Sequence, residues 1–200
     1  MKLIVDDARL SEIQRLYEVY PVDGVTTNPT LLARAGGAPF ETLRGIRAFI
    51  GGEAELHAQV TARDASGMLE DAERIVGELG GNTFVKVPAV PEGFRAMRRM
   101  RERGMRVTAT TIYAPMQAYL AAQCGAAYVA PYVSRIDNTG GDGVDVALRI
   151  HALLRANDLP TRVLAARFKS VRQVLALCEA GIGAARAIFP NARPARDGDK

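Results

Sequence analysis

Short apolar or β-branched runs alternate with segments of helical periodicity along nearly the whole chain. The expected strands are Leu3–Val5, Val22–Thr27, Leu56–Val60, Thr83–Val87, Arg106–Ile112, Ala127–Val133 and Arg162–Ala166, with a weaker eighth at Ala185–Phe189. The expected helices are Ser11–Tyr20, Pro39–Ile50, Asp64–Leu79, Glu92–Arg103, Pro115–Gln123, Val144–Ala156 and Ser170–Ala180. Strands and helices that alternate at this spacing are typical of parallel βαβ units. Eight repeats favour an α/β fold of the (β/α)8 TIM-barrel type over an open doubly wound sheet, and no GxGxxG follows an early strand.

The length of the chain fits one such barrel at its lower size limit, since barrels of about 200 to 250 residues are typical. The sequence has 200 residues, with no internal linker or low-complexity segment. We expect a single barrel domain over residues 1–190. Residues 191–200 contain proline, glycine and five charges, so we expect a disordered tail there and no eighth helix.

Composition excludes several classes of protein. No run approaches the roughly 18 consecutive apolar residues of a membrane span. Asp6 and Asp7 directly follow the first apolar run, which is unlike a signal peptide. Cys124 and Cys178 are too few for a disulfide scaffold and lack CxxC spacing. These features predict a cytoplasmic protein that does not bind membranes.

The positive charge of the chain comes mainly from arginine. The net charge is +4, and only four of the 26 basic residues are lysines. A basic cluster from Arg98 to Arg106 alternates with methionines in a helical pattern and has no interleaved aromatic residues. We therefore interpret it as a solvated helix face and expect no nucleic-acid partner. Guanidinium groups match phosphate in a bidentate geometry, so the arginine bias suits phosphorylated ligands.

Polar residues mark the ends of the predicted strands, where barrel enzymes place their catalytic groups. These residues are Asp6, Thr26, Thr27, Asn28, Gln59, Lys86, Thr110, Tyr132, Arg135 and Arg167. Strand ends are also polar simply because they meet solvent, and for any single residue this simpler interpretation is favoured. Lys86 is the exception, because apolar residues flank it on both sides.

Strand alternation places Lys86 on the same face as Phe84 and opposite Val85 and Val87. Both faces of a parallel barrel are buried, so the lysine should be desolvated and its pKa should fall. A free amine is what attack on a carbonyl requires, so Lys86 is a candidate for imine (Schiff-base) chemistry. A lysine that extends to the rim, or one that pairs with Asp6, remains the alternative.

Metal and serine-nucleophile chemistry have no support. His57 and His151 are far apart and have no ligand spacing with a cysteine, so we expect structural or surface roles for both and no metal site. No GxSxG motif is present.

Three ordered blocks carry a resemblance to a known family. They are the segments 24–30 (GVTTNPT), 84–88 (FVKVP) and 130–143, which contains APYVSRID and GGDG. The first resembles a signature of the transaldolase family, and the second resembles the segment that holds its Schiff-base lysine. The likeness runs from Leu3 to about Ala180. It implies imine formation by Lys86, hydroxyl binding by Asp6 and Asn28, and no cofactor.

Within this family the short chain resembles the fructose-6-phosphate aldolase branch, because Gln59 and Tyr132 match the aldolase pattern where small transaldolases usually have glutamate and phenylalanine. The resemblance implies that Gln59, Thr110 and Tyr132 position a proton-transferring water, with Tyr132 as general acid and base. Arg135 would bind phosphate, and Thr26 would contribute to the substrate site. Transfer of a dihydroxyacetone unit between sugar phosphates of the pentose phosphate pathway is the alternative activity.

Two features depart from the family pattern. Arg167 stands where a phosphate-binding serine is usual, and the C-terminus is shorter than usual for the family. A second arginine either strengthens phosphate binding or fills the site. A truncated sugar-phosphate-binding protein with little turnover is therefore a third hypothesis. The family also implies a homo-oligomer, a pentamer or decamer.

Overall fold

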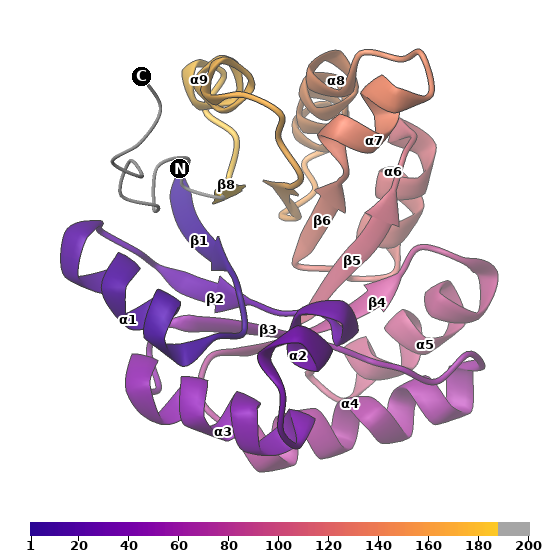
Figure 1. The fold of residues 1–200 in the computed structure, drawn as a ribbon. Helices are drawn as coiled ribbons and strands as arrows, with labels where there is room; N and C mark the ends of the chain where they lie inside the picture. The colour runs from indigo at the N-terminus through magenta and orange to yellow at the C-terminus, as the bar shows by residue number, and fades with distance from the viewer. Residues whose placement is uncertain (188–200) are drawn as a thin grey trace, which may run out of the picture.

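A computed structural model describes residues 1–187, and in this range eight parallel strands close into a barrel in sequence order, with β8 pairing back onto β1 (Figure 1). The strands are β1 (Lys2–Asp6), β2 (Gly24–Thr26), β3 (Glu55–Gln59), β4 (Thr83–Pro88), β5 (Val107–Ile112), β6 (Tyr128–Pro131), β7 (Arg162–Ala165) and β8 (Ala184–Ala187). The predicted TIM barrel is thus confirmed. The end of the predicted domain and the predicted tail, 191–200, lie outside the described residues.

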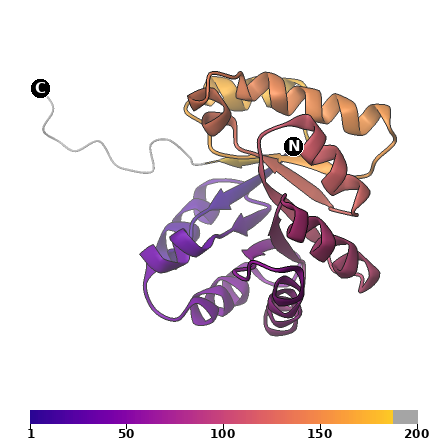
Figure 2. The same ribbon diagram turned by 90° about the vertical axis from the view of Figure 1, so that its right-hand side faces the viewer.

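The helices lie around the outside of the barrel (Figure 2). They are α1 (Leu10–Val19), α2 (Pro29–Ala35), α3 (Pro39–Ile50), α4 (Ala65–Leu79), α5 (Pro91–Glu102), α6 (Pro115–Gln123), α7 (Val133–Asn138), α8 (Gly143–Ala156) and α9 (Val171–Glu179). The sequence patterns did not predict α2 and α7, which are short. Within the described range, no helix has both the length and the apolar character that crossing a bilayer requires.

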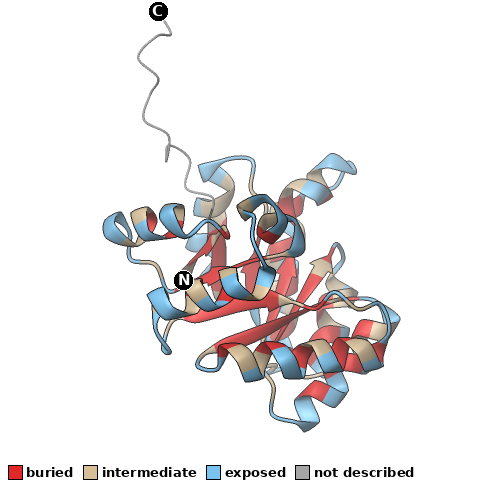
Figure 3. Cartoon of the chain, turned by 60° about the horizontal axis from the view of Figure 1, so that its bottom comes forward, coloured by how far each residue is buried: buried red, intermediate tan, exposed pale blue. Residues whose placement is uncertain are grey.

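The alternation along each strand separates two cores. Outward residues such as Val5 and Val85 pack against the helices in the larger core. Inward residues form a second, smaller cluster, which consists of Ile4, Phe84, Tyr128, Leu164 and Ala184. Buried residues accordingly concentrate on the strands and on the inner helix faces, while the outer helix faces are exposed (Figure 3). Residues two positions from this inner cluster also point into the barrel, and they include Lys86.

The carboxyl ends of β5 and β6 are irregular. The register between these strands shifts between Ala109 and Ile112, where Thr111 adopts a φ of 62°. The predicted strand Ala127–Val133 also ends early, because β6 stops at Pro131 and α7 begins at Val133. Tyr132 retains a single bridge to Ala166. Such irregularities re-aim side chains at the rims of barrels.

Two glycines in the motif blocks permit close backbone approach. A Cβ at Gly24 would lie 2.3 Å from the carbonyl oxygen of Glu55, so only glycine lets β2 and β3 pair at this point. A Cβ at Gly143 would lie 2.2 Å from the carbonyl oxygen of Val133. The backbone N–H of Gly143 donates to Asp137 at 2.8 Å, which ties the loop before α8 to α7. Gly24 thus permits strand pairing at the amino-terminal end of the barrel, and Gly143 shapes a loop at the carboxyl end.

Candidate active site

Lys86 lies inside the barrel and is 1% exposed. Its Cα pairs with Gln59 on one side and Thr108 on the other, and its Nζ donates a hydrogen bond to the backbone carbonyl of Thr27. Burial lowers the pKa of Lys86 from 10.5 to about 7. The charges of Arg186 and Arg167 act in the same direction, and the charge of Asp6 acts against them. The lysine therefore does not extend to the rim, and much of it is a free amine near neutral pH.

Asp6 pairs with an arginine rather than with Lys86. Nη2 of Arg186 on β8 lies 2.7 Å from Oδ2 of Asp6, and the arginine side chain is 3% exposed. The alternative interpretation, in which Lys86 forms an ion pair with Asp6, is therefore wrong. The second oxygen of Asp6 is buried and has no hydrogen-bond partner within residues 1–187. It is available to a hydroxyl group of a ligand.

Tyr132 and Thr110 form a hydrogen-bonded pair. The tyrosine hydroxyl and Oγ1 of Thr110 are 2.7 Å apart and buried. Tyr113 packs against the ring of Tyr132 edge-on, with centroids 5.9 Å apart. A fixed phenol beside a hydroxyl can hold a water and relay a proton. The action of these two residues on one water stays a prediction.

The two predicted phosphate-binding arginines converge on Tyr132. The guanidinium carbon of Arg135 lies 5.2 Å from the centroid of the tyrosine ring, and that of Arg167 lies 5.3 Å from it. Arg135 is exposed and donates to the hydroxyl of Tyr113 at 3.2 Å. Arg167 is half-buried and has a φ of 61°. Two cations around one ring make this rim suitable for a phosphate group.

The other predicted residues lie on the neighbouring strands and loops. Thr26 is fully buried, and its Oγ1 has no partner within the described part of the chain. Asn28 caps α2, since its side-chain oxygen accepts from the N–H of Leu31 at 3.1 Å. Asn28 was predicted to bind substrate, and one polar atom of its side chain is therefore already engaged in this hydrogen bond. Thr27 contributes its carbonyl to Lys86, as described above.

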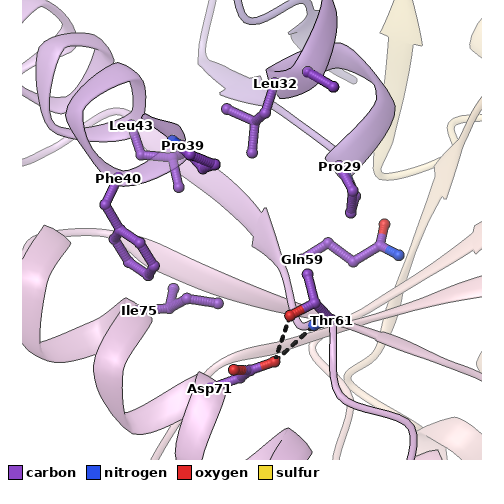
Figure 4. A pocket seen from close by; sticks show the side chains of 10 residues that line it. Pro29, Leu32, Pro39, Phe40, Leu43, Gln59, Thr61, Asp71 and Ile75 are labelled. Atoms are coloured by element: carbon purple, nitrogen blue, oxygen red, sulfur yellow. Dashed lines mark hydrogen bonds between the residues drawn. The ribbon is translucent and has the colours of Figure 1, made fainter. Parts of the chain in front are cut away.

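Gln59 lies next to Lys86 in the strand register, at the end of β3. It is half-buried and lines a largely apolar cavity of about 160 Å³ between α2, α3 and α4 (Figure 4). Thr61 and Asp71 form a hydrogen-bonded polar edge of this cavity. No hydrogen bond joins Gln59 to Thr110 or Tyr132 in the structure of residues 1–187. Its role in holding a water stays a prediction.

A buried polar network fills the opposite, amino-terminal end of the barrel. Glu55 accepts from Lys2 at 2.5 Å and from the hydroxyl of Tyr128 at 3.0 Å, and its second oxygen faces His57 at 3.3 Å. Burial acts to raise the pKa of Glu55, but the bonds from His57 and Lys2 outweigh it and hold the pKa at about 2. His57 also bonds Thr108 at 2.9 Å. This histidine is structural, as the sequence predicts.

Arg186 is the residue that the sequence analysis missed. It falls in the weakest predicted strand, among alanines, where period-two alternation gives no visible contrast between faces. The signal that could have identified Arg186 was its charge in an otherwise apolar run. It lies two positions after Ala184, so both residues share the inner face of the strand. Closure of β8 onto β1 brings its side chain against Asp6.

Comparisons with known proteins agree with this geometry. Residues 3–185 match the family described as Transaldolase/Fructose-6-phosphate aldolase. A curated protein of Streptococcus pneumoniae (strain ATCC 700669 / Spain 23F-1), named probable fructose-6-phosphate aldolase, is 37% identical over 188 residues, which cover 94% of this chain and 85% of that protein. The solved structure titled "Native KDPGal structure" superposes with a TM-score of 0.64 at 14% identity, over 97% of this chain and 87% of that one. The last likeness concerns the fold alone.

Proposed function

The chain belongs to the transaldolase/fructose-6-phosphate aldolase family and is an enzyme of aldolase or transaldolase type, and on that premise we propose that it cleaves or forms fructose 6-phosphate. The products of cleavage would be dihydroxyacetone and glyceraldehyde 3-phosphate. The observation that carries the proposal is the fully buried amine of Lys86, with a pKa of about 7, inside the barrel. The name of the Streptococcus pneumoniae relative supports this choice of substrate.

In the proposed reaction, the amine of Lys86 adds to the C2 carbonyl and water leaves, which gives an imine. The C3–C4 bond then breaks, its electron pair moves toward the imine nitrogen, and the proton of the C4 hydroxyl leaves as the aldehyde forms. Asp6 would hold that hydroxyl, and its buried oxygen, which has no partner among residues 1–187, supports this role. Thr26 and Asn28 would contact the remaining hydroxyl groups.

The three-carbon enamine left on Lys86 decides between the two activities. If it gains a proton at C3, hydrolysis releases dihydroxyacetone. If it meets an acceptor aldehyde first, a new carbon–carbon bond forms and the reaction is a transfer. The Tyr132–Thr110 pair, 2.7 Å apart, supports protonation through a held water. We therefore favour the aldolase reaction over transaldolase.

A coupled assay tests the proposal. Glyceraldehyde 3-phosphate formed from fructose 6-phosphate is measured with and without erythrose 4-phosphate as acceptor, and borohydride trapping with dihydroxyacetone is followed by mass spectrometry. An aldolase releases product without the acceptor, whereas a transaldolase requires the acceptor. Trapping without turnover would favour the sugar-phosphate-binding hypothesis. The absence of both would contradict the proposal.

Trapping should depend on pH through the amine of Lys86. Because burial lowers its pKa from 10.5 to about 7, the lysine is charged below pH 7 and free above it. At pH 6 only about a tenth of the amine is free, so the initial trapping rate should rise roughly tenfold between pH 6 and pH 8 and then level off. A rate that still rises steeply above pH 9 would indicate an ordinary lysine and contradict this assignment.

The arginine pair should favour phosphorylated substrates. Arg135→Ala removes one charged hydrogen-bond donor, so KM for fructose 6-phosphate should rise about tenfold, with little effect on unphosphorylated fructose. Arg167→Ser should act in the same direction, because both guanidinium groups lie about 5 Å from the Tyr132 ring. If the Arg167 variant becomes more active, that arginine obstructs the site. If neither KM nor kcat changes, it does not contact the substrate.

We further propose that the enzyme needs no metal or organic cofactor and works in the cytoplasm as a homo-oligomer, a pentamer or decamer. The family resemblance supports these statements. Activity that is retained after exhaustive chelation would support the absence of a metal. The mass of the purified protein in solution tests the oligomeric state.

A further inference from the structure

Arg186 carries a guanidinium group that is buried inside the barrel. It projects from β8 into the barrel, and its Cα pairs with Ile4, two residues before Asp6. One nitrogen donates to Asp6 at 2.7 Å, and Nε is buried without a partner in the described part of the chain. Burial of a charged group with an unmade hydrogen bond is costly. A ligand that completes the set of hydrogen bonds would offset this cost.

Arg186 and Lys86 both point into the barrel, where Asp6 and its neighbours connect them: Asp6 pairs with Arg186 and stands in register with Thr26, and the carbonyl of the next residue, Thr27, accepts from Lys86. The charge of Arg186 lowers the pKa of Lys86. It also lowers the pKa of His57, on which burial has the largest effect and Glu55 acts in the opposite direction. Asp6 is the acid that pairs with Arg186, while Glu55 is taken up by Lys2 and Tyr128 at the far end of the barrel. Positive charge therefore exceeds negative charge around the amine. This part of the barrel interior favours an anionic group.

The depth of Arg186 decides which anion fits. In fructose 6-phosphate the phosphate is four carbons from the carbonyl that Lys86 would attack, and Arg135 and Arg167 at the rim are suited to it. A guanidinium inside the barrel, where Lys86 also lies, suits an anion attached to the carbonyl carbon itself. A carboxylate meets this condition, and its two oxygens match the N–H fork of arginine.

Resting on the proposed imine chemistry of Lys86, we infer that the enzyme also accepts 2-oxo acids as nucleophilic donors, with Arg186 holding the carboxylate. The amine adds to the keto carbon and water leaves. A proton passes from C3 to a water that the Tyr132–Thr110 pair would hold, and the resulting enamine attacks an aldehyde to form a carbon–carbon bond. Hydrolysis then restores the lysine and releases a 4-hydroxy-2-oxo acid, with no oxidant or reductant needed.

Reductive trapping of the intact protein provides the test. Pyruvate, methyl pyruvate and dihydroxyacetone are each titrated with borohydride, and the mass gained at Lys86 is measured. The half-saturating concentration should be about ten- to a hundredfold lower for pyruvate than for methyl pyruvate, because the ester lacks the charge. If dihydroxyacetone is trapped but pyruvate is not, this inference fails while the proposed function stands. If neither is trapped, both fail.

Variants assign the effect to Arg186. In Arg186→Met the ratio of pyruvate to dihydroxyacetone trapping should fall about ten- to a hundredfold, and Arg186→Lys should retain part of it. The ratio cancels any change in the reactivity of the amine, which affects both probes. Arg162→Met is the matched control, since Arg162 is an exposed arginine at the opposite end of the adjoining strand β7. Its ratio should stay at the wild-type value.

A double variant separates direct binding from screening. Arg186→Met leaves Asp6 unpaired, and that carboxylate would itself repel pyruvate. In the double variant Asp6→Asn/Arg186→Met the repulsion is absent, so a ratio that stays low supports direct contact with Arg186. Recovery of the ratio would mean that the arginine only screens Asp6, and it would overturn the inference, as would an unchanged ratio in the single variant.

Discussion

Replacing Lys86 by methionine should abolish both borohydride trapping and turnover of fructose 6-phosphate, a loss of at least about a thousandfold. The variant removes the amine that would form the imine, and the charged residues described around it, Arg186, Asp6 and Arg167, are not primary amines. The fold should persist, because methionine fills a similar volume and replaces a group that burial already penalises. The measurements are trapped mass, kcat and the circular dichroism spectrum.

Lys169→Met is the matched control. Lys169 is exposed and donates to Asn138 at 2.5 Å, outside the barrel interior. This variant should keep wild-type trapping and turnover. Undiminished trapping in the Lys86 variant, with the spectrum unchanged, would show that another lysine is the nucleophile.

Tyr132→Phe should lower the release of dihydroxyacetone by about a hundredfold or more, within the range for loss of a general acid or base, and should lower transfer to erythrose 4-phosphate much less. Phenylalanine keeps the ring contacts with Tyr113 and the two arginines but loses the hydroxyl paired with Thr110. Without that hydroxyl, protonation of the enamine slows and the acceptor competes better. Both rates are measured on the same enzyme preparation.

Tyr119→Phe serves as the control for loss of a phenol elsewhere, because its hydroxyl accepts from Gln123 on the outer helix α6. Neither reaction should change in that variant. An equal fall of release and transfer in Tyr132→Phe would assign the tyrosine to packing or general binding, and it would remove the reason for preferring aldolase to transaldolase chemistry.

The barrel could be predicted from sequence because its signal is repeated. Seven units each have an apolar run followed by a segment of helical periodicity, an eighth apolar run follows them, and the units agree with one another. The helices α2 and α7 were missed for a local reason. The Asn28–Pro29 pair is a helix start, with a capping side chain and proline in the first turn, but the helix has only seven residues. In α7, Tyr132 and Val133 continue a β-like run, so the strand was predicted too long.

The candidate site was predictable where alternation is clear. Val85 and Val87 on either side of Lys86 face the outer core, so the inward orientation of Lys86 follows from the alternation. The pairing of Tyr132 with Thr110 could not be derived this way, because it depends on the register shift near Thr111. Arg186 depends on barrel closure, which joins the two ends of the described chain. Secondary-structure propensity and hydrophobic periodicity describe single strands and helices, and they do not predict a contact between the first strand and the last.

The ion pair between Asp6 and Arg186 links the first strand to the last, and this has a consequence for the order of events in folding. Almost the whole described chain separates the two residues, so their contact has a high loop-closure cost and belongs to the slowest class of native contacts. A chain emerging from the ribosome can pair β1 with β2 early, but it cannot join β8 to β1 until β8 has been synthesised. Asp6 and Arg186 therefore meet only when this seam closes. The set of residues around Lys86 is completed in the same step as the barrel, so a half-finished chain carries the nucleophile and Asp6 but lacks the arginine that pairs with Asp6.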